Sequence, residues 1–364
     1  MKKIMTAGLL AAVLIASVNA RENVPLGAEN LYELSSPTAL TSGASVTGGA
    51  IFSSGPESLI VNPALTSREQ RVKLNLADTF LFSANSENAV KLGDAFQAGI
   101  VVPFKMFVLS GYLNGTFVNL DELKYGNIVT IKSGLSKDIT EKLSVGAGLN
   151  ASLAWLPDLD WGFSANLGFV YFQGNLGFLR DFRYGVSALN LGKCYGQKIT
   201  GDIPGYPTLG TFKAGAAASF VKNQNVDFGW ALDLTTPLFQ NLLVDAELKL
   251  GIKDMLFFGI NEKFNLQETL DGNYNFIPSA SVSFKFTFDV HKKSADDEKS
   301  FAGYLEKHDW SESELRVSAG YKNFYQTAHA VSIGADLSLG LEDKTPPVIE
   351  LWLDEEEDDE ADEF

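Results

Sequence analysis

Residues that commonly carry out chemistry in enzymes are few in this chain of 364 residues. It contains one cysteine, Cys194, and three scattered histidines, His291, His308 and His329. A single cysteine excludes an internal disulfide and a cysteine-rich zinc site. The sequence also has neither the Gly-x-Ser-x-Gly elbow of serine hydrolases nor the His-Glu-x-x-His motif of zinc proteases. We therefore expect a protein that is not an enzyme and that has no metal or cofactor site.

One run of residues resembles a dinucleotide-binding motif. It is Gly-Ala-Gly-Leu-Asn-Ala, from Gly146 to Ala151. The phosphate-binding form of this motif joins a strand to the N-terminus of a helix. Here the run lies within a segment of alternating apolar and small or polar residues, and no helical pattern follows it. We interpret it as part of a strand.

The charge of the chain is negative and unevenly distributed. There are 29 Lys and Arg residues against 45 Asp and Glu, which gives a net charge of −16. This balance argues against a nucleic-acid-binding surface, which needs clustered basic residues. Ten of the carboxylates lie between Glu350 and Glu363, and without them the net charge is −6. Like charges repel, so we expect residues 341–364 to form a disordered, solvated tail. The alternative is a tail that binds calcium or a basic periplasmic protein.

The first 20 residues have the composition of a secretory signal peptide. Lys2 and Lys3 precede an uncharged, mostly apolar stretch from Ile4 to Val18. Small residues then lead to an expected cleavage site between Ala20 and Arg21. The apolar stretch is short for a membrane-spanning helix, so we expect an exported protein.

Apolar residues alternate with small or polar ones along most of the remaining chain. The alternation is clearest in Leu143–Trp155 and Trp161–Tyr171, and a period of two is typical of a strand with one apolar face. We expect about 14 strands by this pattern rule. The others are Arg71–Ser83, Asp94–Val102, Phe107–Phe117, Gly126–Leu135, Phe182–Leu189, Thr211–Phe220, Val226–Leu234, Leu242–Ile252, Met255–Phe264, Ser279–Val290, Leu315–Tyr321 and Val331–Leu339.

The length and polarity of these runs predict an all-β, antiparallel up-and-down barrel that spans the outer membrane over residues 71–340. A tilted strand that crosses a bilayer has about 9–11 residues, whereas strands of soluble sandwiches usually have about 5–6 residues. The second face of each run carries Ser, Gly, Asn and charged residues, as a polar lumen would. Parity places Leu149 toward lipid and Asn150 toward the lumen. The alternative is a secreted all-β protein.

The lengths of the predicted connections alternate between short and long. Pro103–Met106, Ser136–Lys142, Val221–Asn225 and Lys253-Asp254 are short, and they fall at every second connection. Short turns are typical of the periplasmic side of such barrels. The exception is the charged segment His291–Ser313, which is either a periplasmic insertion, with a helix around Ala302–Lys307, or the sign of a miscounted strand.

Residues 21–70 do not alternate and are rich in small residues. They contain Gly48-Gly49-Ala50 and end near the turn-forming Asn62-Pro63-Ala64. Asn and Pro are frequent in ordinary turns. A barrel of about 14 strands encloses a lumen that is wide enough to leak unless it is filled. We therefore expect this segment to form a hatch inside the lumen.

Several of these features resemble the FadL family of outer-membrane transporters of hydrophobic compounds. The resemblance lies in Gly48-Gly49-Ala50, in Ser58-Leu59-Ile60-Val61-Asn62-Pro63-Ala64 and in the meander of strands that follows. Two further runs, Tyr184–Gly192 and Pro207–Gly215, are similar to PorV-type barrels of a secretion system. The chain departs from the FadL pattern at Leu65, where the family commonly has Gly.

The resemblance implies a barrel that passes long-chain fatty acids or other hydrophobic small molecules, with Asn62, Pro63 and Ala64 in a lumenal hatch. PorV-type barrels imply an alternative, a permanently plugged scaffold or shuttle that binds proteins. Either protein would contact outer-membrane lipid and the barrel assembly machinery. Because the chain ends in acidic residues before Phe364, we expect the assembly signal in Val331–Leu339.

Overall fold

The structure is a computed structural model, and it describes residues 34–41, 45–83, 91–120, 124–155, 159–193, 210–237, 239, 241–270, 277–289, 312–324 and 328–340. The expected signal peptide, the acidic tail and most of the segment 291–313 lie outside these ranges.

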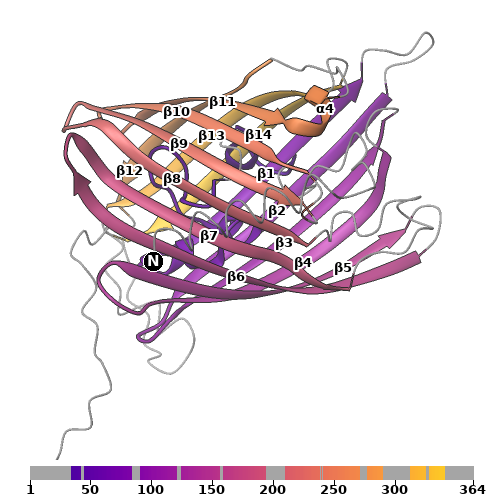
Figure 1. Ribbon diagram of the computed structural model, residues 1–364, viewed down its shortest axis with the longest axis horizontal. Coiled ribbons are helices and arrows are strands. Elements are labelled where there is room, and N and C mark those ends of the chain that lie inside the picture. Colours follow the sequence, from indigo (N-terminus) through magenta and orange to yellow (C-terminus); the bar gives the residue numbers. More distant parts are fainter. Residues whose placement is uncertain are drawn as a thin grey trace, which may run out of the picture.

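The chain folds into a closed barrel of 14 strands (Figure 1). Each strand pairs with the next one in the sequence, and β1 pairs with β14 to close the barrel. All pairs are antiparallel, as in an up-and-down meander. The strands are β1 (Val72–Ser83), β2 (Lys91–Pro103), β3 (Val108–Asn119), β4 (Lys124–Asp138), β5 (Leu143–Trp155), β6 (Leu159–Leu176), β7 (Leu179–Lys193), β8 (Thr211–Lys222), β9 (Val226–Pro237), β10 (Leu243–Ile252), β11 (Leu256–Asn265), β12 (Ser279–Phe288), β13 (Ser313–Phe324) and β14 (Ala328–Leu339).

The predicted fold class is confirmed, because each predicted strand coincides with one strand of the barrel. The boundaries differ by a few residues. The largest difference is in β6, which continues to Leu176 and pairs there with Leu179 of β7 in a tight hairpin. Strand pairing with a neighbour, which the alternation pattern does not report, extends the strand beyond Tyr171.

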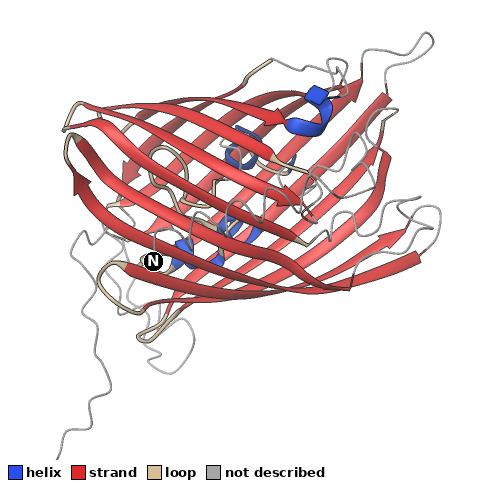
Figure 2. Ribbon diagram, viewed as in Figure 1, coloured by secondary structure: helices blue, strands red, loops and turns tan. Residues whose placement is uncertain are grey.

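The two ends of the barrel differ in their connections. The turns between β2 and β3, β4 and β5, β6 and β7, β8 and β9, and β10 and β11 are short and lie at one end, on the left in Figure 2. We call this the short-turn end, and it is the periplasmic end by the usual arrangement of such barrels. β1 begins there and β14 ends there, because Val72 pairs with Leu339. The strand count is therefore correct, and Phe288 and Ser313, which are paired across β12 and β13, place the connection 289–312 at the short-turn end.

The outer and inner faces of the wall differ in polarity, as the alternation predicts. In β5, Leu149 is 50% exposed on the outside and Asn150 is 3% exposed on the inside. Leu76, Ile131 and Ile333 are more than half exposed on the outside of other strands. An exterior of this kind suits the hydrocarbon core of a bilayer, since a closed barrel leaves no backbone edge unpaired.

Helices are short and few in the described ranges. α2 (Pro37–Thr41), η2 (Pro56–Ile60) and η3 (Pro63–Thr66) precede the barrel, and α4 (Leu266–Leu270) follows β11. In the described part of the chain, no helix has the length and apolar character needed to cross a membrane.

Candidate functional site

The residues that precede β1 lie inside the barrel. We call residues 34–41 and 45–70 the lumenal segment; its helices are seen within the ring of strands in Figure 2. The segment bonds to inward-facing side chains on many sides of the wall. Ser35 bonds to Gln97 of β2, Thr66 to Ser136 of β4, and the carbonyl of Val61 accepts from Ser187 of β7. The segment is therefore held in the lumen by polar contacts around the barrel.

The predicted hatch residues lie at the centre of this packing. Asn62 caps η3, and its Oδ1 atom accepts a hydrogen bond of 3.0 Å from the backbone N–H of Ala64. Its Nδ2 atom donates to the carbonyl of Val46 at 2.8 Å and to that of Phe169, on β6, at 3.1 Å. Pro63 takes the first position of η3, where its missing N–H costs nothing. Asn62 thus joins two parts of the lumenal segment to the wall.

Wall glycines make room for the lumenal segment. A Cβ atom on Gly146 of β5 would lie 2.5 Å from the backbone nitrogen of Ala64. A Cβ atom on Gly168 of β6 would overlap Asn62, and one on Gly99 of β2 would overlap Pro56. Any larger residue at these positions would push the segment away from the wall. The glycines on the inner face are therefore matched to the segment that covers them.

The helical part of the lumenal segment has an apolar core with the wall. Leu59, Ile60 and Leu65 form a buried cluster with Tyr112 of β3 and Val170 of β6. Such burial stabilises the folded protein by about 25 cal/mol for each Å² of apolar surface that is removed from water. η2 and η3 are therefore fixed by apolar packing as well as by hydrogen bonds.

The loop before η2 is held differently, by buried charged side chains. Asp233 of β9 accepts a hydrogen bond of 3.1 Å from the backbone N–H of Val46, and Glu247 of β10 accepts one of 2.7 Å from that of Ala50. Arg183 of β7 donates from Nε to the carbonyl of Thr47 at 2.8 Å and from Nη2 to that of Gly49. All three charged residues are at least 96% buried. The wall therefore recognises the peptide groups of this loop through charge-assisted hydrogen bonds.

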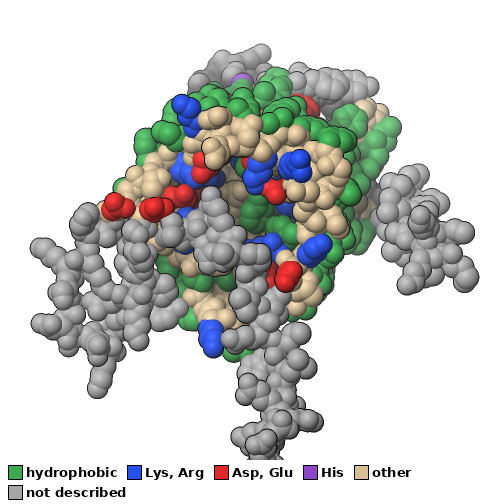
Figure 3. Space-filling model, turned by 90° about the vertical axis from the view of Figure 1, so that its left-hand side faces the viewer, with side chains coloured by type: hydrophobic (Ala, Val, Ile, Leu, Met, Phe, Trp, Pro, Cys, Tyr) green, Lys and Arg blue, Asp and Glu red, His purple; other side chains and the backbone are tan. Residues whose placement is uncertain are grey.

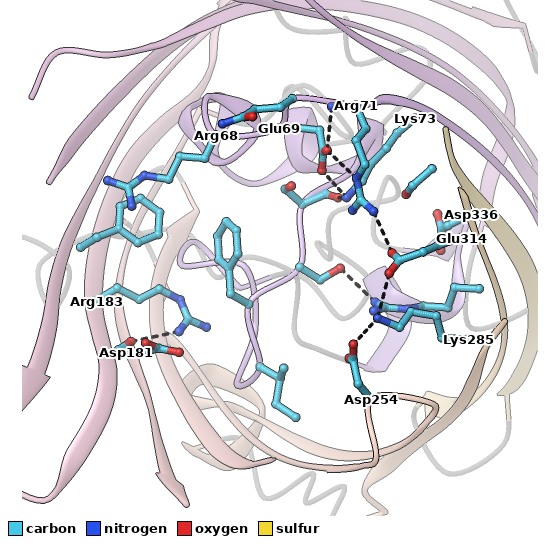
Figure 4. A pocket seen from close by; sticks show the side chains of 18 of the residues that line it. Arg68, Glu69, Arg71, Lys73, Asp181, Arg183, Asp254, Lys285, Glu314 and Asp336 are labelled. Atoms are coloured by element: carbon cyan, nitrogen blue, oxygen red, sulfur yellow. Dashed lines mark hydrogen bonds and ion pairs between the residues drawn. The ribbon is translucent and has the colours of Figure 1, made fainter. Parts of the chain in front are cut away.

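A cavity of about 610 Å³ opens below the lumenal segment at the short-turn end. The view onto this end shows Lys, Arg, Asp and Glu side chains gathered around a hollow (Figure 3). Arg71 pairs with Glu314 at 2.9 Å, and Lys285 pairs with Glu314 at 3.0 Å and with Asp254 at 2.5 Å (Figure 4). These contacts join the residue before β1, β12, β13 and the turn after β10 into one charged network around the mouth.

Two carboxyl groups of the lumenal segment at this mouth have opposite electrostatic environments. Burial would raise the pKa of Glu69, but the positive charges of Lys73 and Arg71 outweigh it and hold the pKa below its usual value. Burial and the negative charge of Asp336 raise the pKa of Glu57 to about 7. The Glu57 Oε2 atom is buried and accepts no hydrogen bond from a described residue, which is consistent with a carboxyl group that is easily protonated.

The lumen is apolar at the opposite end. Residues at the outer ends of seven strands face inward there and pack against Leu34 and Leu40 of the lumenal segment. We call this set the outer apolar cluster. Its other members are Leu81, Ala95, Val118, Leu120, Ile128, Ala154, Phe324, Ala328 and Ala330. The polar inner face expected from the sequence is therefore interrupted at this end.

The sequence patterns predicted some of the residues of the site and gave no indication of others. Ala20 and Arg21, the expected cleavage site, lie outside the described residues. Parity alone puts Arg183, Asp233 and Glu247 toward the lumen, but it carries no sign of what they bind. In the described part of the chain, no group of three or more His, Cys, Asp or Glu side chains is placed to hold a metal ion.

A closed antiparallel barrel with an apolar exterior, short turns at one end and a largely polar interior is the architecture of outer-membrane β-barrels. The chain is an outer-membrane β-barrel by these features, and its lumen contains its own N-terminal segment.

Comparison with known proteins gives similarity in structure but none in sequence. No protein-family model and no curated protein matches the sequence. The toluene transporter TbuX of Ralstonia pickettii is a similar solved structure, with 12% identity, a TM-score of 0.49, and coverage of 85% of this chain and 98% of TbuX. The toluene transporter TodX of P. putida has 10% identity and a TM-score of 0.47 over 88% of this chain and 100% of TodX. The monoaromatic hydrocarbon channel CymD has 13% identity and a TM-score of 0.48 over 86% of this chain and 100% of CymD.

Proposed function

We propose that this protein passes hydrophobic small molecules, such as long-chain fatty acids, across the outer membrane. The observation that carries the proposal is the outer apolar cluster. Inward-facing Leu81, Val118 and Phe324 give the external end of the lumen an apolar lining, which Leu34 and Leu40 of the lumenal segment cover in this structure. An apolar solute that takes the place of these two leucines would gain about 25 cal/mol for each Å² of its surface that leaves water.

The height of the wall beside this cluster supports a route for such solutes. β12 begins at Ser279, which pairs with Asn261 of β11. β11 continues beyond this point to Asn265, and β13 continues beyond Tyr321 to Phe324. The described wall is thus lower at β12 than at its neighbours, and Phe324 lies at that point. A solute in the outer apolar cluster is close to the lipid as well as to the lumen.

Uptake measurements test the proposal and its substrate class. Cells that lack their own transporter would be supplied with labelled long-chain fatty acid or with labelled toluene, with and without this protein. We expect faster uptake of fatty acid with the protein. Leu81→Asn should lower uptake severalfold, whereas Leu81→Met, which keeps an apolar side chain of similar volume, should not. Equal uptake with and without the protein would exclude transport of these compounds.

A permanently plugged scaffold of the PorV type is the second candidate. It is favoured by the number of wall strands that bond the lumenal segment, from Gln97 of β2 to Glu247 of β10. In that case fatty acid uptake would not depend on the protein, and a protein partner would co-purify with it after cross-linking in cells. The acidic tail is the proposed docking point for a periplasmic partner.

A further inference from the structure

The lumenal segment is attached to the wall in two different ways. η2 and η3 share the apolar core around Leu59 and fit against wall glycines, so their removal would expose apolar surface. The residues from Val46 to Ala50 bond through their peptide groups to Arg183, Asp233 and Glu247, and their apolar contact with the wall is small, since it consists of Ala50 packed against Ala217 and Ala231. Hydrogen bonds to peptide groups can be exchanged for bonds to water once the site is wet, whereas a buried apolar core has no such replacement. The loop is therefore the part of the segment that can leave the wall.

There is space on both sides of this loop. A gap of about 30 Å³, which Lys249 also lines, separates the loop at Gly48 and Gly49 from Ser58 and Leu65 of the helical part. On its other side, Ile51, Phe52 and Ser53 border the cavity of about 610 Å³ at the mouth. The loop can thus move toward the periplasm without displacing η2 or η3 once the hydrogen bond from Asn62 to the carbonyl of Val46 and the packing of Phe52 against the core around Leu59 are released.

The backbone of the loop is suited to such a movement. Gly48 and Gly49 have φ angles of +84° and +87°, a region that glycine occupies without strain. The carbonyl of Gly48 accepts a hydrogen bond of 3.0 Å from the N–H of Ser53, which closes a compact turn. The turn can move as a unit once its wall contacts with Arg183, Asp233 and Glu247 break.

Arg183 occupies the centre of the wall contacts. Its guanidinium group bonds to the carbonyls of Thr47 and Gly49 and lies 5.3 Å from the ring centre of Phe52. Its Nη1 atom also donates to the carbonyl of Asp181 on β7, and Asp233 and Glu247 hold the adjacent N–H groups of the loop. Arg183 therefore binds the carbonyl groups of the loop, and the two carboxyl groups bind its N–H groups.

We propose that Arg183 is the positioning residue that keeps the loop 45–53 closed, and that solutes pass the lumenal segment along β7, β9 and β10 when the loop moves into the mouth cavity. This proposal builds on the proposed transport function, which it supplies with a route through the lumen.

Thiol accessibility tests the movement itself. In a Cys194→Ser background, Val46→Cys introduces a thiol in the loop and Leu59→Cys introduces one in η2, both at positions that are at most 1% exposed. Adding Arg183→Gln should speed the reaction of the loop thiol with a water-soluble maleimide by about tenfold or more, since a charge-assisted hydrogen bond usually contributes at least one factor of ten to an equilibrium. The thiol in η2 should stay slow.

Solute efflux from liposomes tests the consequence. Arg183→Gln should release a small sugar faster than the wild type, and Arg183→Lys, which keeps the charge but not the two-pronged geometry, should lie between them. Lys285→Gln is the matched control, because Lys285 lines the same cavity and, among the described residues, its ion pairs are with Asp254 and Glu314 and not with the loop.

The results separate the two proposals. The proposed role of Arg183 would be overturned if Arg183→Gln left the reactivity of the loop thiol unchanged, or if the loop and η2 thiols reacted equally fast. If the loop thiol became reactive but fatty acid uptake did not depend on the protein, the role of Arg183 would stand and the proposed transport would be excluded. Folding of each variant is checked by the shift in gel mobility that heating causes in intact barrels.

Discussion

At the scale of single residues, Asn62 connects two parts of the lumenal segment to each other and to the wall. It is fully buried and bonds to the backbone of Val46, Ala64 and Phe169. Asn62→Ala would remove these three buried hydrogen bonds, so we expect a loss of about 2–3 kcal/mol in the free energy of unfolding. Urea titration in detergent micelles measures this loss. Asn62→Asp keeps the bond to Ala64 but not the two donated bonds, and an effect as large as that of alanine would show that the cap contributes little.

The protonation of Glu57 gives a prediction about pH. Its pKa is raised from 4.5 to about 7 by burial and by Asp336. A carboxyl group whose pKa is higher in the folded protein binds a proton that the unfolded chain releases, so its stability is present in acid and lost as pH rises through about 7. Glu57→Gln removes this loss. We expect the variant to match the wild type at pH 4 and to be more stable by at most about 3 kcal/mol at pH 8.

Unfolding curves at the two pH values test this expectation. Glu141→Gln is the control, because Glu141 is an exposed carboxylate on the rim of the same cavity. If both variants gain the same stability at pH 8, the gain comes from the lower overall charge of the mouth and not from the burial of Glu57.

At the scale of elements, the direction of each side chain in the wall has a direct test in β12. Phe284 is 49% exposed on the outer face, and the adjacent Ser283 shares the inner face with Lys285. An arginine in the lipid-facing band costs about 2–4 kcal/mol near the bilayer midplane. We therefore expect Phe284→Arg to lower the fraction of folded barrel in outer membranes and Ser283→Arg to leave it unchanged. The heat-dependent shift in gel mobility measures this fraction, and equal effects of the two variants would contradict the assigned faces.

The strands could be predicted from the sequence because the alternation of apolar and polar residues is contained within each strand. The partners of the inward-facing residues could not be predicted, since these contacts join distant parts of the chain. Arg183 and Thr47 are 136 residues apart in the sequence, and they meet in the closed barrel with the lumenal segment inside it. Alternation itself fails at Asn190, where φ is +56° and the register between β6 and β7 shifts. Beyond that residue the parity changes, so Leu191 faces outward while Asn190 remains buried.

At the scale of the whole molecule, the hydrogen bonds that close the barrel are independent of those that hold the lumenal segment. The wall is held by strand pairs that close on themselves from β1 to β14, and none of these backbone bonds involves the lumenal segment. Removal of the segment would leave charged wall residues such as Arg183 and Glu247 facing a water-filled lumen. Water can solvate them there, so they would not prevent the barrel from forming.

A chain that lacks residues 34–66 should therefore assemble as a less stable but open barrel. We expect it to admit small sugars into liposomes, and we expect the full chain to exclude them, because η2, η3 and the loop 45–53 fill the lumen above the mouth cavity. The rate of liposome swelling in sugar solutions of increasing size measures both the opening and its width. If the shortened chain folds but excludes sugars as well as the full chain does, then closure does not depend on the lumenal segment, and the route proposed along β7, β9 and β10 is wrong.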